Sequence, residues 1–132
     1  MQLGVSEVET PLGPARVLVS EPPGQVLGTL VLGHGAGGGA EAPDLVAVAD
    51  AAAVEGWRAL RVEQPWRVAG GRIAPPPARL DVAWTAVLER LRDDGLLTGA
   101  LVLGGRSAGA RVACRTATSA GFFLSEWSPG TA

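Results

Sequence analysis

The chain has no lysine, asparagine or tyrosine, and a single isoleucine, histidine and cysteine among its 132 residues. The codons of the missing residues are rich in A and T, so we expect a G+C-rich bacterial gene. All 11 basic residues are arginines, scattered along a chain of net charge −2. Such a chain lacks the clustered basic surface that binds nucleic acid, so we expect no nucleic-acid partner.

The lone cysteine, Cys114, excludes an internal disulfide and favours a reducing compartment. The segment Met1–Gly13 contains early acidic residues and lacks the apolar core of a signal peptide. No apolar run approaches the ~18 residues that a membrane span needs. We therefore expect a soluble, cytoplasmic protein with no membrane partner. With 47% apolar residues, residues 1–132 are expected to form a single domain around one core.

Short apolar runs alternate with longer segments of helical periodicity, which is typical of an α/β fold with a mostly parallel sheet. The segments Val5–Glu9 and Ala15–Ser20 flank a proline-rich turn and predict an antiparallel hairpin at the start. The other predicted strands are Thr29–Leu32, Trp57–Val62, Ala100–Leu103 and Gly121–Leu124. The predicted helices are Asp44–Glu55, Leu80–Arg92 and Ala108–Ala117.

Local signals refine this outline. Asp44 is expected to cap the first helix, and Trp66–Pro77 is expected to be irregular because it is rich in arginine, glycine and proline. The strand Ala100–Leu103 has no polar side chain and is expected to be buried on both faces. The second helix carries an apolar stripe at helical spacing, formed by Leu80, Trp84, Val87, Leu88 and Leu91.

A serine motif follows the strand Ala100–Leu103. The pattern G-x-S-x-G is present as Gly105-Arg106-Ser107-Ala108-Gly109. Between a strand and a helix, this pattern places the serine on a sharp, strained turn, and the flanking glycines let strand and helix approach closely. The first N–H groups of the helix suit an oxyanion. We predict Ser107 as a nucleophile and Ala108 as an oxyanion donor; the alternative is a tight turn with an unreactive serine.

A glycine-rich loop, His34-Gly35-Ala36-Gly37-Gly38-Gly39, follows the strand Thr29–Leu32. Glycines let a backbone N–H reach a substrate oxygen without a Cβ clash. The loop resembles the one after the third strand of α/β-hydrolases, which supplies the second oxyanion N–H. By that resemblance, an amide near Gly35 or Ala36 is predicted to converge with that of Ala108 above Ser107. The alternative is a flexible loop in which His34 is a structural hydrogen-bonded residue.

The same loop satisfies the dinucleotide pattern G-x-G-x-x-G over residues 33–38, and Glu63 follows where a ribose-binding acid is sought. That pattern opens a helix within its glycines, whereas here the helix is predicted to begin only at Asp44. Dinucleotide binding is therefore the third alternative for function. A phosphate-binding P-loop is excluded because Arg106 stands where its lysine would be.

Both glycine motifs, together with Gln64-Pro65 after a strand, resemble those of small bacterial α/β-hydrolase-like proteins. These are related to dienelactone hydrolases, to testis-expressed α/β-hydrolase-like proteins and to a scaffold subunit of the NSL histone acetyltransferase complex. The resemblance covers about residues 15–117. It implies a three-layer α/β-hydrolase fold with Ser107 in the nucleophile position. Members are described mainly as hydrolases of unknown substrate, and some relatives are scaffolds.

The chain departs from the family after its serine. The catalytic triad of this fold runs serine, then acid, then histidine, but Glu126 is the only acid after Ser107 and no histidine follows. We therefore expect an incomplete, C-terminally truncated fold that comprises the N-terminal half. His34 as a substitute base is the less favoured alternative to a structural role.

The remaining cysteine, arginine and tryptophan candidates are expected to have structural roles. Cys114 is expected in the core, and Arg106 and Arg111 are expected to be solvated or ion-paired instead of binding an acidic substrate group. The tryptophans are expected in the core or in pocket walls.

The combined prediction is a serine hydrolase of ester or acyl bonds, inactive as this chain, with a small-molecule substrate and neither cofactor nor metal. The alternative is a non-catalytic or interaction protein of the same fold. An uncovered sheet edge and apolar patch are expected to promote self-association.

Overall fold

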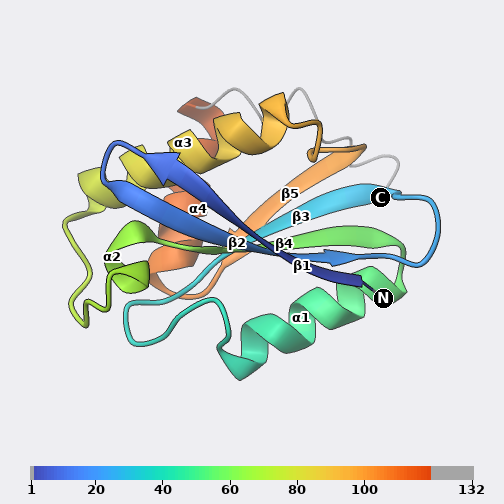
Figure 1. Ribbon diagram of the computed structural model, residues 1–132, viewed down its shortest axis with the longest axis horizontal. Helices are drawn as coiled ribbons and strands as arrows, with labels where there is room; N and C mark the ends of the chain where they lie inside the picture. Colours follow the sequence, from blue (N-terminus) through green and yellow to red (C-terminus); the bar gives the residue numbers. More distant parts are fainter. Residues whose placement is uncertain (1, 120–132) are drawn as a thin grey trace.

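The computed structural model describes residues 2–119 and holds one mixed sheet with helices on both faces (Figure 1). The strands are β1 (Gln2–Thr10), β2 (Gly13–Glu21), β3 (Gly28–Gly33), β4 (Trp57–Glu63) and β5 (Ala100–Gly105). The helices are α1 (Pro43–Val54), α2 (Pro65–Val68), α3 (Pro77–Asp93) and α4 (Ala108–Ser119).

The sheet has the order β1-β2-β4-β3-β5. The predicted N-terminal hairpin is confirmed: β1 and β2 are antiparallel, and Thr10 pairs with Gly13 at the turn. β2 continues antiparallel onto β4, whereas β4, β3 and β5 are mutually parallel. The carboxyl ends of these three strands therefore lie at one edge of the sheet, which is where ligands bind in open α/β folds.

Three layers result, as the family resemblance implies. α1 covers one face of the sheet, and α3 and α4 cover the other (Figure 1). The larger core lies under α3, whose predicted apolar stripe is buried; Trp84 at its centre has no exposed surface. The smaller core, under α1, is formed by Leu32, Leu45, Ala49 and Ala59.

The start of α1 differs from the prediction. Asp44 is not the N-cap: Ala42 takes that position and Pro43 is the first helical residue. Proline suits this position because its ring fixes φ and the N–H it lacks would have had no partner there. The Asp44 carboxylate lies in the first turn instead, where it accepts a hydrogen bond from the Leu45 N–H at 3.0 Å.

Three further expectations are wrong. The segment predicted as irregular contains the short helix α2, which begins at Pro65 in the same proline-first manner. Cys114 is exposed on α4 instead of buried. β5 is only partly buried apart from Leu101, because β3 is its one partner among the described strands and Val102 borders an open apolar groove beside α1.

The predicted strand Gly121–Leu124 lies outside the described residues. Within residues 2–119, no helix combines the length and apolar character needed to cross a lipid bilayer.

Candidate active site

Ser107 lies in the turn between β5 and α4, as the motif predicts. Its backbone φ is 55°, and among residues 2–119 it is the one non-glycine residue with positive φ. Such a left-handed conformation costs a residue with a Cβ about 1–2 kcal/mol. The turn is held by the Arg106 N–H, which donates to the Gly33 carbonyl at 3.1 Å, and by the Gly109 N–H, which donates to the Arg106 carbonyl at 2.9 Å. The strain predicted for Ser107 is therefore confirmed.

Three glycines make this turn possible. Gly109, on the first turn of α4, packs directly on Gly33 at the end of β3, and a Cβ on Gly109 would overlap the Gly33 carbonyl group. A Cβ on Gly105 would lie 2.5 Å from the same carbonyl oxygen and 2.8 Å from the Gly109 carbonyl carbon. The residues two before and two after Ser107 must therefore be glycine, which is the steric reason for the G-x-S-x-G spacing.

The glycine-rich loop after β3 lies beside the serine. A Cβ on Gly35 would be 3.5 Å from the Ser107 Cβ, so the two backbones are in near contact. The loop begins with a turn in which the Gly38 N–H donates to the Gly35 carbonyl at 3.4 Å. Loop and serine together border an open cleft of about 520 Å³. Its lining residues are Gly35, Ala36, Gly37, Gly38, Gly39, Ala42, Pro43, Arg106 and Ser107.

The predicted oxyanion residues are thus brought together at one end of the sheet. Gly35 and Ala36 line the cleft with Ser107, and Ala108 follows Ser107 as the first residue of α4. N–H groups in the first turn of a helix have no acceptor within the helix. The convergence of these amides on a substrate oxygen stays a prediction.

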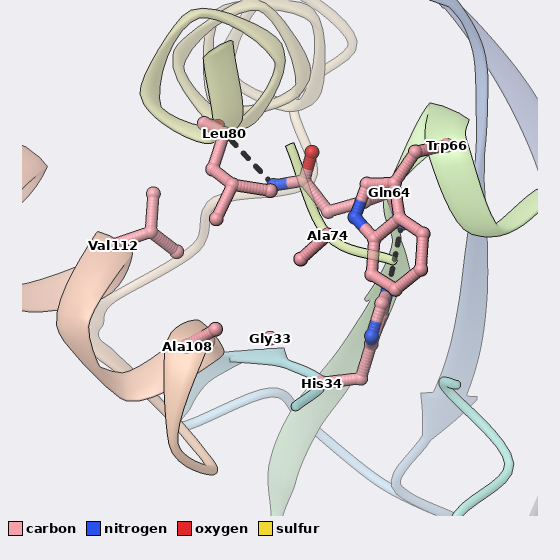
Figure 2. Close-up of a pocket in the computed structure, with 9 residues that line it drawn as sticks. Gly33, His34, Gln64, Trp66, Ala74, Leu80, Ala108 and Val112 are labelled. Carbon is pink, nitrogen blue, oxygen red and sulfur yellow. Dashed lines mark hydrogen bonds between the residues drawn. The ribbon is translucent and has the colours of Figure 1, made fainter. Parts of the chain in front are cut away.

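His34 is the first residue of the loop, and its ring lies beside Gln64 and Trp66 (Figure 2). Its side chain is buried, with 3% of its surface exposed. The Gln64 N–H donates to His34 Nε2 at 3.0 Å, so the ring proton is on Nδ1, which donates to the Gly35 carbonyl at 2.8 Å. The Gln64 side chain in turn donates to the Leu80 carbonyl at 3.2 Å, and the Trp66 ring lies 5.6 Å from the imidazole.

These contacts give His34 the structural role that its sequence position favours. Burial lowers the pKa of the imidazole below its ordinary value of 6.5. The hydrogen bond to the Gly35 carbonyl and the charge of Glu63 raise the pKa, but by less than burial lowers it. Both ring nitrogens are engaged in holding the loop, so neither is available to take a proton from Ser107.

The far end of the loop is anchored at Ala40. Its N–H donates to Glu63 Oε1 at 3.1 Å, and its carbonyl accepts from Arg61 Nη1 at 2.8 Å. Glu63 also lies 3.8 Å from the Arg16 guanidinium. The acid considered for ribose binding therefore holds the loop, and α1 begins only after the glycines, at Pro43. Neither feature fits a dinucleotide fingerprint.

Arg106 is ion-paired, as expected. Its Nη1 lies 2.7 Å from Asp44 Oδ2, and the pair joins the serine turn to the first turn of α1. Sequence reasoning missed this contact and the anchoring by Glu63 and Gln64. Asp44 and Arg106 are 62 residues apart, and no local pattern connects them.

The cleft has no general base among its described lining residues: none is a histidine or a carboxylate. Within residues 2–119, no cluster of three or more histidine, cysteine, aspartate or glutamate residues could hold a metal ion.

A sequence-family model described as an alpha/beta hydrolase domain matches residues 27–124. An alpha-beta serine hydrolase homologue from Coxiella burnetii has a similar structure, with a TM-score of 0.78 and 19% identity over 90% of this chain and 59% of that one. An esterase from Pyrobaculum calidifontis gives a TM-score of 0.68 and 26% identity over 90% of this chain and 39% of that one.

A dienelactone hydrolase from Anabaena variabilis gives a TM-score of 0.71 and 19% identity over 89% of this chain and 57% of that one. The chain thus spans less than three fifths of the length of these structures. No curated protein sequence matches it significantly.

Proposed function

This chain belongs to the alpha/beta hydrolase domain family, and from that premise we propose that it carries the nucleophile and oxyanion-binding half of a serine hydrolase. The substrate class is an ester or similar acyl compound of small size. No cofactor or metal takes part in the proposed reaction.

The observation that carries the proposal is the conformation of Ser107. A φ of 55° at a non-glycine residue, fixed by three glycines in backbone contact, is a strained arrangement that the surrounding structure maintains. Ser107 follows the carboxyl end of β5 and borders a cleft large enough for a small acyl substrate. A structural turn gains nothing from a strained serine.

The proposed reaction begins with attack of Ser107 Oγ on the substrate carbonyl carbon. The new O–C bond places negative charge on the carbonyl oxygen, which the amides of Ala108 and of Gly35 or Ala36 stabilise. The bond to the leaving alcohol then breaks, and the alcohol departs with a proton. Water hydrolyses the acyl-serine in the same way and releases the acid.

A general base must accept the serine proton, and a second group must orient that base. The only histidine of the chain is His34, whose ring nitrogens hold Gln64 and Gly35. The proposal therefore assigns the base and its acid partner to a source other than residues 2–119, and the isolated chain is inferred to turn over esters very slowly.

Fluorophosphonate labelling tests the proposal. Phosphorus forms a bond to the serine oxygen, fluoride leaves and the serine proton passes to water. The chain has six serines, and we expect Ser107 to react first because the amides stabilise the developing charge. Peptide mapping would locate the adduct, with Ser107→Ala as the loss-of-label variant and Ser6→Ala, on exposed β1, as the matched control. Labelling of Ser107 no faster than Ser6 would refute the nucleophile assignment.

One observation favours a second candidate, a non-catalytic protein of the same fold. The commitment of His34 to the loop leaves the cleft without a base among its described residues. In that case the strained turn at Ser107 has no catalytic role, and Ser107 would show no enhanced reactivity in the labelling experiment. Cytoplasmic location and bacterial origin also stay predictions from the sequence.

A further inference from the structure

We propose that Arg106 is a specificity-determining residue that binds a carboxylate group of the substrate, so that the cleft selects acidic acyl compounds. The inference rests on the proposed function of Ser107. It assigns to the cleft a chemical class of substrate.

Arg106 supplies the charge of the cleft. The other residues that line it, apart from Ser107, are glycines, alanines and a proline, so Arg106 is the one charged residue in the described lining. Its side chain extends beside the glycine loop: a Cβ on Gly35 would lie 4.0 Å from Arg106 Cγ. Arg106 directly precedes Ser107, and both residues line the same cleft. One small substrate could therefore place a carboxylate on the guanidinium and its reacting carbonyl at Ser107.

Asp44 positions the guanidinium. One carboxylate oxygen of Asp44 accepts the Leu45 N–H in the first turn of α1, and the other lies 2.7 Å from Arg106 Nη1. A guanidinium has five N–H donors in a rigid plane, and this contact uses Nη1. The Nε and Nη2 side of the plane retains the fork that binds a carboxylate through two parallel hydrogen bonds.

The Asp44 charge does not cancel this preference. Side-chain exposure is 65% for Arg106 and 46% for Asp44, and exposed ion pairs are worth little in water. Asp44 is absent from the described lining, whereas Ala42 and Pro43, at the positive end of α1, line the cleft. A carboxylate inside the cleft would therefore meet a guanidinium, a helix start and loop amides, with no acidic side chain among the described lining residues.

A pair of probes tests the inference. The first is an alkyl fluorophosphonate whose chain ends in a carboxylate, and the second is the same compound ending in a primary amide. The labelling rates at Ser107 are monitored by intact-protein mass spectrometry, and the measured quantity is the ratio of the two rates. We expect the carboxylate probe to react about 2- to 5-fold faster, as one solvent-exposed ion pair allows.

Arg106→Gln should lower this ratio to about one, and Arg106→Lys should keep part of it because a charge remains without the planar fork. Arg111→Gln is the matched control: it removes the same charge from an exposed position on α4 that is not part of the described cleft lining. Its ratio should equal that of the wild type.

The outcomes separate the two proposals. If the amide probe labels Ser107 but the wild-type ratio is near one, or if Arg106→Gln leaves the ratio unchanged, the assignment of Arg106 is wrong and the nucleophile assignment stands. If neither probe labels Ser107 preferentially, the proposed function itself fails.

Discussion

Gly109 lies against Gly33 so closely that a Cβ on Gly109 would overlap the Gly33 carbonyl carbon and oxygen. The obstacle is backbone at the end of a central strand, which cannot move aside as a flexible side chain can. We therefore predict that Gly109→Ala lowers the free energy of unfolding by about 3 kcal/mol or more, at the upper end of overpacking costs. Urea denaturation monitored by tryptophan fluorescence would measure it.

Gly37→Ala is the control for that variant, because a Cβ there has nothing within 4 Å. Its stability should be unchanged or slightly higher. Equal stabilities for the Gly109 and Gly37 variants would show that strand β3 and helix α4 are not held in contact.

Replacement of Ser107 distinguishes strain from chemistry. Because φ is 55°, the free energy of unfolding should be about 1 kcal/mol higher for Ser107→Gly than for Ser107→Ala. Glycine adopts this conformation without a steric penalty. Neither variant should accept a fluorophosphonate at this position. If the alanine variant is as stable as the glycine variant, the turn is not strained in solution.

Stability should depend on the protonation of His34. Burial lowers the pKa of the folded imidazole below 6.5, so the unfolded chain binds a proton more readily. The contribution of neutral His34 is therefore fully present above pH 6.5 and is lost as pH falls from there toward the lower pKa of the folded state. Urea midpoints measured between pH 7.5 and 5 should fall in the wild type.

His34→Gln provides the control, because the chain has no other histidine. The part of the pH dependence that lies just below pH 6.5 should disappear in this variant. Its persistence would mean that His34 titrates alike in the folded and unfolded states, and that its bond from the Gln64 N–H is not maintained.

Ester turnover should be very low for the isolated chain. Loss of the histidine from a competent triad costs roughly six orders of magnitude in kcat, and the cleft has no base among its described residues. Hydrolysis of p-nitrophenyl acetate by the wild type should therefore match that of Ser107→Ala within error. Robust turnover that is lost on Ser107→Ala would contradict the expectation and would indicate a base in the chain.

The sequence predicted those parts of the fold that depend on local patterns. Alternating apolar runs located all five described strands, and helical spacing located the buried stripe of α3 around Trp84. The G-x-S-x-G spacing predicted the turn at Ser107 because its steric requirements are local. The glycine loop was predicted for the same reason, because its motif directly follows a strand in the sequence.

The errors arose where tertiary contacts decide. Cys114 has a small, apolar side chain that fits a core, but its side of α4 faces outward. Asp44 has the chemistry of a helix cap, yet its carboxylate is engaged by Arg106 from a distant turn. The role of Glu63 was also missed: it was considered only for the disfavoured ribose-binding alternative, whereas in the fold it holds Ala40. Such pairings depend on which elements pack together, and periodicity carries no information about them.

The apolar surface on the α1 side of the sheet leads us to predict association between copies of this chain. An open apolar groove of about 450 Å³ lies beside α1, lined by Leu30, Val48, Ala51, Ala52, Glu55, Trp57 and Val102. β5 borders it and has a strand partner on one side only among the described strands. An apolar patch next to an unpaired strand edge is a template for contact with another chain. We therefore expect light scattering to detect dimers or larger species at micromolar concentration.

Two matched variants locate that contact. Val48 lines the groove with 48% of its surface exposed, and Val82, on α3 at the opposite face, is 46% exposed. Glutamate at position 48 would place a charge in the groove, where its burial against a second chain costs several kcal/mol, so Val48→Glu should shift the protein toward monomer. Val82→Glu adds the same charge away from the groove and should leave the distribution unchanged. A wild-type chain that is monomeric at all concentrations, or equal effects of the two variants, would show that the groove is not a contact surface.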